Sequence, residues 1–99
     1  MTQKQKTNVM PVIAKFYGIV IRMLCTQALG ARIHAFYGDS ELVVGLWPVR
    51  IIQGEAPTRV RDLVLDWARQ HQQELLTGWR RLQEGLPPLR IAPSPYCLD

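Results

Sequence analysis

The hydrophobic pattern of this chain changes its period once, close to Gly54 and Pro57. Before that point apolar residues alternate with other residues in short runs, as in strands whose side chains point alternately to the two faces of a sheet. After it they recur at steps of three and four, as in a helix that buries one side. Strands followed by a helical segment predict an α+β fold. We expect a small antiparallel sheet of about four to five strands in residues 11–53, packed against a long amphipathic helix in residues 57–85.

Turn-forming residues divide the first half of the chain into separate strands. Val12 opens the first strand, Ile19–Cys25 forms the second and Ile33–Tyr37 forms the third. Pro48 has no N–H to donate to a ladder, so the fourth strand bends or ends there. Val49–Ile52 then resumes as an edge strand.

The turn Tyr37-Gly38-Asp39-Ser40 sets the register of the third and fourth strands. Gly38 suits the positive φ at the first central position of a two-residue type II′ turn, which matches the twist of a hairpin. Tyr37 then pairs with Ser40, and alternation assigns each further residue to one face. The predicted core face contains Ile33, Ala35, Tyr37, Leu42, Val44 and Leu46. The predicted outer face contains Arg32, His34, Phe36, Glu41, Val43, Gly45 and Trp47.

The second half carries one continuous apolar stripe at helical spacing. A helix over residues 57–85 would be about 43 Å long, more than a domain of this size easily covers, so we expect a break near His71–Gln73. Gly85 ends the helix, and we expect Leu89 and Ile91 to pack back on the domain. The stripe consists of Val60, Leu63, Val64, Trp67, Ala68, His71, Leu75, Leu76, Trp79 and Leu82.

Length and composition fit one globular domain. The chain has 99 residues, 47% hydrophobic and 20% charged, which is enough apolar material for one core. We assign residues 10–92 to the domain, residues 1–9 to an N-terminal extension and residues 93–99 to a C-terminal tail.

The sequence favours a cytoplasmic location. Cys25 and Cys97 form neither a disulfide framework nor a zinc motif, as expected in a reducing compartment. Residues 1–10 have no apolar stretch typical of a secretory signal. The longest apolar run, Ile19–Cys25, contains Arg22 and is too short to cross a membrane.

The formal net charge of +4 raises the question of nucleic-acid binding. Half of that excess comes from Lys4 and Lys6 in the N-terminal extension. Phosphate binding needs clustered cations, and the clearest candidates are on the predicted helix: Arg59, Arg61, Arg69, Arg80 and Arg81.

No residue pattern in the chain predicts a catalytic, cofactor or metal site. His34 and His71 are the only histidines, and a metal site would need further donors converging on them. His71 belongs to the helical stripe, and Glu41 is only a diagonal neighbour of His34 across the predicted ladder. The sequence therefore favours a non-enzymatic protein without a small-molecule substrate.

Two aromatic residues of the predicted outer face stand out. Trp67 and Trp79 match the helical stripe and are expected in the core, whereas Trp47 shares the outer face with Phe36 and Arg32. Exposed aromatics beside an arginine are typical of protein interfaces. The alternative, that the tail or the end of the helix covers Trp47, stays open.

Several segments resemble a bacterial family known as domain of unknown function 4160. They are Met10–Met23, His34-Ala35, Tyr37-Gly38, Ile51–Gly54 before Pro57, and the Leu65–Leu82 segment with Trp67, His71, Glu74, Leu75 and Trp79. Together they span residues 10 to about 91. The resemblance implies a compact α+β domain of uncharacterised activity, which belongs to a two-gene, toxin–antitoxin-like pair.

The chain also departs from the pattern of that family. The family has an acid and a histidine before a proline run, followed by His-Phe-His, where this chain reads Thr26–His34, and only the last histidine remains. Phe36, Gly45 and Trp47 stand where polar or acidic residues are usual. We therefore expect that a metal or acid–base site built on those positions is absent from this chain.

Two hypotheses from different functional classes follow. The first is a protein–protein interaction module that binds a protein partner, or a second copy of itself, through Arg32, His34, Phe36 and Trp47. The second is a nucleic-acid-binding regulator or RNA-directed toxin that uses the five helical arginines.

Overall fold

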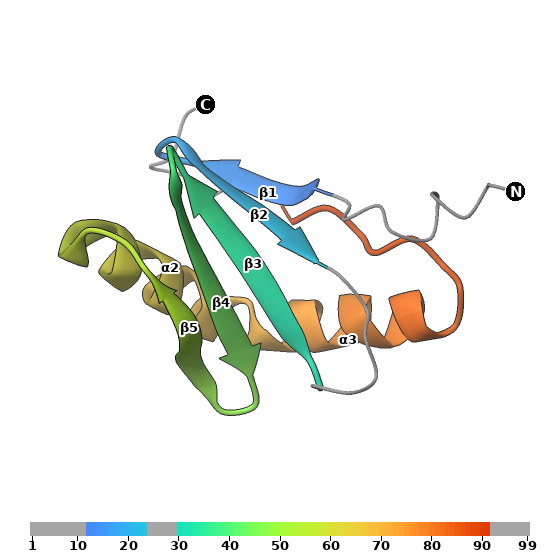
Figure 1. Cartoon of the computed structure of the whole chain (residues 1–99). Helices are drawn as coiled ribbons and strands as arrows, with labels where there is room; N and C mark the ends of the chain where they lie inside the picture. The colour runs from blue at the N-terminus through green and yellow to red at the C-terminus, as the bar shows by residue number, and fades with distance from the viewer. Residues whose placement is uncertain (1–11, 24–29, 92–99) are drawn as a thin grey trace, which may run out of the picture.

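The computed structural model describes residues 12–23 and 30–91. Within these ranges the chain forms one five-stranded antiparallel sheet in the order β1-β2-β3-β4-β5, followed by two helices (Figure 1). The elements are β1 Val12–Phe16, β2 Ile19–Met23, β3 Arg32–Tyr37, β4 Ser40–Leu46, β5 Val49–Glu55, α2 Thr58–Gln70 and α3 Gln72–Gln83. The predicted α+β fold is confirmed.

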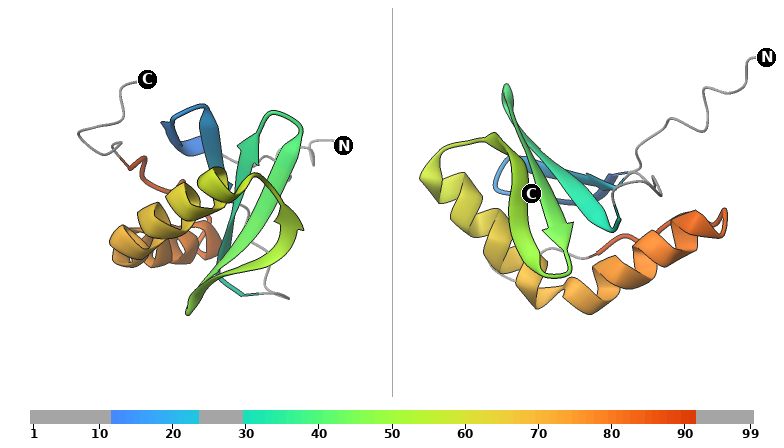
Figure 2. Two further views of the ribbon diagram at one scale, coloured as in Figure 1. Left: turned by 90° about the vertical axis from the view of Figure 1, so that its left-hand side faces the viewer. Right: turned by 60° about the horizontal axis from the view of Figure 1, so that its bottom comes forward.

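The sheet and the helices form two layers. Figures 1 and 2 show α2 and α3 on one face of the sheet, which we call the inner face. Apolar side chains of all five strands and both helices meet between the layers. The fully buried members of this core include Phe16, Ile21, Met23, Ile33, Leu42, Val44, Leu46, Val64 and Leu75.

The hairpin register predicted from the Gly38 turn is confirmed. Tyr37 pairs with Ser40, and Gly38 has a φ of +57°, which suits the first central position of the expected turn. The assignment of Tyr37 to the core is wrong, because this side chain is 39% exposed. It lies beside the Tyr17-Gly18 turn, where a Cβ on Gly18 would be 3.6 Å from the Tyr37 ring.

The helical segment breaks where expected. His71 has φ −110° and ψ 21° and separates α2 from α3, so the two helices meet at an angle (Figure 2). The Gln72 side chain donates a hydrogen bond to the Leu46 carbonyl at 2.7 Å, which attaches the bend to the end of β4. The break allows both helices to follow the twisted sheet.

The end of α3 and the segment after it are also held by specific bonds. Gly85 has a φ of +82°, and its N–H and that of Leu86 donate to the Leu82 and Arg81 carbonyls, which is a Schellman C-cap. Ile91 is buried, and its N–H donates to the carbonyl of Ile13 in β1 at 2.8 Å. The expectation for Ile91 is confirmed.

The expectation for Leu89 is wrong, because its side chain is 61% exposed. Leu89 precedes Ile91 by two residues in a segment without helical or strand structure, and only Ile91 reaches the core. Pro57, expected in the first helical turn, instead forms the N-cap of α2.

Some sequence-based expectations fall outside the described residues. These are the extension at residues 1–9, Leu24 and Cys25 of the second strand, the Thr26–Leu29 part of the segment that departs from the family pattern, and the tail at residues 93–99 with Cys97. Across the described part of the chain, neither helix has the length and hydropathy needed to cross a membrane.

Candidate functional site

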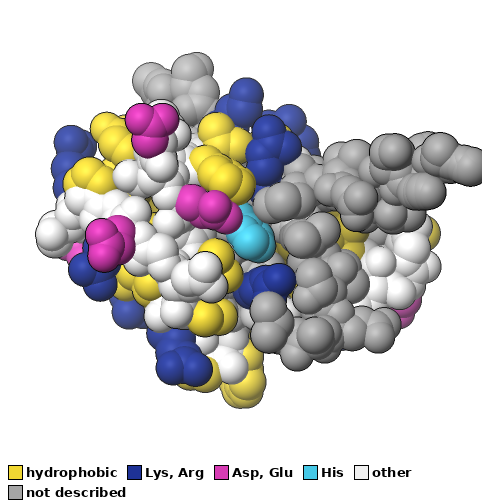
Figure 3. All heavy atoms as spheres, viewed as in Figure 1, with side chains coloured by type: hydrophobic (Ala, Val, Ile, Leu, Met, Phe, Trp, Pro, Cys, Tyr) yellow, Lys and Arg dark blue, Asp and Glu magenta, His cyan; other side chains and the backbone are white. Residues whose placement is uncertain are grey.

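The outer face of the sheet, opposite the helices, carries three of the four predicted partner-binding residues, Arg32, His34 and Phe36. Cross-strand pairing sets three rows across this face. They are Val20, Phe36 and Glu41; Arg22, His34, Val43 and Gln53; and Arg32, Gly45 and Arg50. Figure 3 views this face and shows a histidine beside an acidic side chain near its middle.

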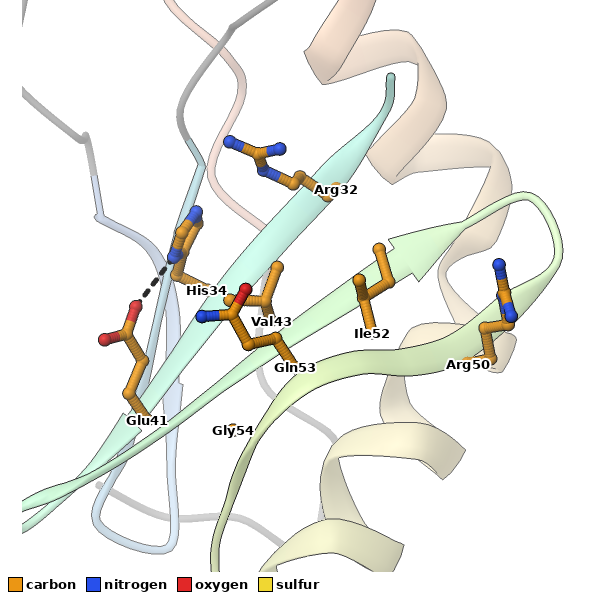
Figure 4. Close-up of a pocket in the computed structure, with 8 residues that line it drawn as sticks. All are labelled: Arg32, His34, Glu41, Val43, Arg50, Ile52, Gln53 and Gly54. Atoms are coloured by element: carbon orange, nitrogen blue, oxygen red, sulfur yellow. Dashed lines mark hydrogen bonds and ion pairs between the residues drawn. The ribbon is translucent and has the colours of Figure 1, made fainter. Parts of the chain in front are cut away.

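A hollow of about 390 Å³ lies over β3, β4 and β5 on this face (Figure 4). Its size is within the range of clefts that hold small groups. It is lined by Arg32, His34, Glu41, Val43, Arg50, Ile52, Gln53 and Gly54. We call it the outer-face hollow.

His34 and Glu41 form a bonded pair at one end of the hollow. His34 Nδ1 lies 2.8 Å from Glu41 Oε2, with side chains 13% and 47% exposed respectively. The Phe36 ring stacks on the imidazole with centroids 6.3 Å apart, so the imidazole is held from two sides. The sequence identified Glu41 as a diagonal neighbour of His34, and the structure shows that the diagonal is short enough for a hydrogen bond.

Arg32 is the one charged residue among the described parts of the chain that is buried, at 8% exposed. Its Nε has no hydrogen-bond partner among the described residues, and neither does the buried Nε2 of His34. In Figure 4 the Arg32 and His34 side chains leave β3 on the same side. A buried guanidinium and a buried imidazole nitrogen with unmet hydrogen-bonding capacity therefore share one hollow.

A β-bulge in β5 brings a further polar residue to the hollow. Val43 pairs with Gln53 and Val44 with Ile51, so Ile52 is an extra residue in β5. Ile52 and Gln53 therefore both line the outer face, which strict alternation along a strand would forbid. A Cβ on Gly45 would come within 3.1 Å of Ile52 Cδ1, so the missing side chain at Gly45 leaves room for Ile52.

Sequence reasoning did not single out Arg50, Ile52 and Gln53 as site residues. Arg50 lines the hollow because it pairs with Gly45, and Gln53 lines it because it pairs with Val43 beyond the bulge at Ile52. The one available signal was the placement of Val49–Ile52 at a sheet edge, and that signal contains no information about the bulge.

The structure separates Phe36 from Trp47. Phe36 pairs with Glu41 at the start of β4, whereas Trp47 follows the end of β4 in the Trp47-Pro48 turn. Trp47 is six residues after Glu41, the partner of Phe36, and six residues of strand span about 20 Å. The two aromatics therefore do not form one patch. Trp47 is 74% exposed, so among the described residues neither helix covers it.

Trp47 lines a different hollow, of about 530 Å³, with Pro48, Val49, Arg69 and Gln72. The predicted partner-binding set of Arg32, His34, Phe36 and Trp47 therefore divides into two locations. Arg32 and His34 lie in the outer-face hollow with Phe36 at its margin, and Trp47 lies at the far end of the β4–β5 hairpin.

The five helical arginines do not form one surface. Arg59 and Arg61 lie about 160° apart around α2. Arg69 Nη1 is 3.6 Å from Asp66 Oδ1, and Arg81 Nε donates to the Pro87 carbonyl at 2.8 Å. Arg80 belongs to α3, beyond the bend at His71. The structure thus brings Arg32 and His34 together and leaves the helical cations dispersed.

The outer-face hollow offers hydrogen-bond donors and acceptors, among them the bonded His34–Glu41 pair. No Ser, Thr, Cys, Lys or Tyr lines it among the described residues. In the described ranges no three His, Cys, Asp or Glu side chains converge as metal ligands. His71, the other histidine, bonds Glu74 at 2.5 Å on the helical surface, away from His34. The arrangement suits binding of a polar group.

A comparison with protein families agrees with the sequence resemblance. The family model described as Domain of unknown function (DUF4160) matches residues 18–80, more than half of the chain. The match includes β2 to β5, α2 and most of α3, and with them every residue that lines the outer-face hollow. No curated protein and no solved structure matches the chain. The chain therefore belongs to the DUF4160 family.

Proposed function

We propose that this protein is a non-enzymatic interaction module that holds a protein partner on its outer sheet face, as one member of a toxin–antitoxin-like gene pair. One observation carries the proposal: the buried Arg32 guanidinium in the outer-face hollow has an Nε without a partner among the described residues. Burying a charge is costly unless the charge is paired. A partner group that enters the hollow would supply the missing bond.

Binding fits the hollow better than catalysis does. Nucleophilic catalysis needs a nucleophile beside a base, and no such side chain lines the hollow next to His34 in the described residues. The His34–Glu41 pair alone would hold an imidazole in position, which serves recognition as well as chemistry.

A protein partner fits better than a nucleic acid. Phosphate backbones are bound by rows of cations, but the helical arginines are dispersed, and the outer face has Glu41 bonded to His34 near its middle. The hollow also has apolar lining from Val43 and Ile52, and a mixture of apolar lining with arginine is typical of protein interfaces. Phe36 and Trp47 stay predicted partner contacts at its margin and at the far hairpin.

We further propose that the protein acts in the bacterial cytoplasm. The family resemblance supports a bacterial origin, and the cysteine pattern fits a reducing compartment. The resemblance to a paired-gene family makes the product of the neighbouring gene the first partner to test.

The test is co-purification of the neighbouring gene's product with the tagged full chain. Wild type should retain the product, and Arg32→Gln should weaken retention by at least about tenfold, because a hydrogen bond to a buried charge is lost. Arg90→Gln, the same substitution at an exposed site outside the hollow, should bind like wild type. Equal retention by all three proteins would contradict the proposal.

A nucleic-acid titration at two salt concentrations tests the alternative function, nucleic-acid binding through the helical arginines. Binding that falls steeply with salt and is lost in a double Arg59→Gln, Arg61→Gln variant would support phosphate contacts on α2. That outcome, with no retained protein partner, would replace the proposed function.

A further inference from the structure

We infer that the outer-face hollow is a subsite for one acidic residue of the partner protein, whose carboxylate binds Arg32 and whose backbone N–H donates to His34 Nε2. This inference rests on the proposed function and deepens it, because it names the chemistry of the group that is recognised. It follows from two unmet hydrogen-bonding needs of opposite kind in one hollow.

The first unpaired group is a hydrogen-bond donor, the Nε–H of Arg32. Arginine stays protonated in proteins and has only donors, arranged in a planar fork that matches a carboxylate. Arg32 is 8% exposed and lines the hollow, and its Nε–H finds no acceptor among the described residues. A carboxylate that enters the hollow would supply both an acceptor and the opposite charge.

Glu41 does not fill this role, although it is the one acidic residue that lines the hollow among the described residues. Arg32 pairs with Gly45, which is four residues along β4 from Glu41, or about 13 Å of strand. The Glu41 carboxylate is instead bonded to His34 Nδ1 at 2.8 Å. The charge of Arg32 is therefore left for a group from outside.

The second unpaired group is a hydrogen-bond acceptor, Nε2 of His34. An ionised carboxylate can only accept, so the contact with Glu41 makes His34 Nδ1 the donor. In the neutral imidazole, Nε2 then carries the lone pair and needs a donor, and this buried atom has none among the described residues. A peptide offers a backbone N–H next to an acidic side chain, whereas a phosphodiester group offers acceptors alone.

The remaining lining agrees with an acidic side chain. Val43 and Ile52 provide an apolar wall for the methylene groups that precede a Glu carboxylate. Gln53, brought to this face by the bulge, adds an amide that can donate or accept. The volume of about 390 Å³ suits one or two side chains. The formal charge of +4 on the whole chain favours the approach of an acidic partner.

The test uses two blocked tripeptides, acetyl-Ala-Glu-Ala-amide and acetyl-Ala-Gln-Ala-amide, and inorganic phosphate, each titrated into the full chain. Binding is followed by NMR signals of the arginine Nε–H groups and the His34 imidazole. The Glu peptide should shift the Arg32 and His34 signals saturably, and the Gln peptide should bind at least about tenfold more weakly, because it lacks the charge.

Variants assign the binding to the hollow. Arg32→Gln should weaken the Glu peptide by at least about tenfold, whereas Arg90→Gln should bind it like wild type. If Arg32→Gln fails to fold, the comparison of the Glu and Gln peptides on wild type still decides the matter. Equal binding of the two peptides, no binding of either, or phosphate binding that is tighter than Glu-peptide binding and displaces it would overturn the inference.

The outcomes separate this inference from the proposed function. If neither peptide binds but the Arg32→Gln variant no longer retains the neighbouring gene's product, the interaction module is supported and the carboxylate subsite is contradicted. If the Glu peptide binds but Arg32→Gln leaves retention of the partner unchanged, the subsite is supported and the proposed function is contradicted.

Discussion

At Gly54 the backbone of β5 passes so close to β4 that a Cβ on this residue would collide with the backbone of Glu41. Gly54 also has a φ of +98°, a conformation that side chains disfavour. Both features belong to the place where β5 lines the outer-face hollow, so glycine at this position keeps the hollow open and the two strands paired.

Replacing Gly54 with Ala should therefore destabilise the fold by about 3 kcal/mol, from strain and collision together. Gly85→Ala is the matched control, because Gly85 also has a positive φ of +82° but a Cβ there would meet no atom within 4 Å. It should cost about 1 kcal/mol. Urea unfolding of both variants measures the difference, and equal costs would mean that β5 moves aside easily.

Gly78→Ala should stabilise the protein by about 0.5–1 kcal/mol. Gly78 lies inside α3, where glycine is a poor helix former. A Cβ there would lie 3.4 Å from Pro88 Cβ and 3.7 Å from Met23 Sδ, close to ordinary contact distance. A higher midpoint of thermal unfolding is the expected result. A lower midpoint would show that Pro88 cannot move far enough to accommodate the added methyl group.

Leu75→Ala should cost about 2–5 kcal/mol, because Leu75 is fully buried at 0% exposed and its removal leaves a cavity. Leu89→Ala provides the same substitution at a side chain that is 61% exposed, and it should change the free energy of unfolding by less than about 0.5 kcal/mol. Chemical denaturation compares the two. A large effect of Leu89→Ala would place that residue in the core after all.

Trp47→Ser should leave stability within about 0.5 kcal/mol of wild type, because the indole is 74% exposed. If the partner also contacts the far hairpin, as we predict, retention of the partner should fall by about tenfold. Parallel thermal unfolding and co-purification measure the two effects. Unchanged retention would confine the interface to the outer-face hollow.

The hairpin of β3 and β4 shows how far sequence reasoning reaches. The turn at Gly38 predicted that Tyr37 pairs with Ser40, and that pairing is confirmed. It also placed Arg32 and His34 on the outer face, where they line the hollow. These inferences succeed because turn chemistry and alternation act over a few residues. The break at His71 is expected on a different ground, the length of the helical segment relative to the size of the domain.

The failures have a common physical cause. Alternation alone assigns Trp47 and Phe36 to one patch, but β4 ends at Leu46 and distance along the strand separates the pair. Alternation assigns Tyr37 to the core because it shares a face with Ile33, although its side chain lies at the β3–β4 turn and is 39% exposed. Alternation predicts which way a side chain points, but it does not predict which other residues cover that side chain.

The sequence by itself determined the α+β fold, the register of the central hairpin, the break in the helical segment and the family. Only the tertiary structure decided that Arg32 is buried, that His34 reaches Glu41, and that Ile52 and Gln53 share one face. The first group depends on local periodicity and turn geometry. The second depends on a bulge and on contacts between strands, where a shift of one residue changes which side chains meet.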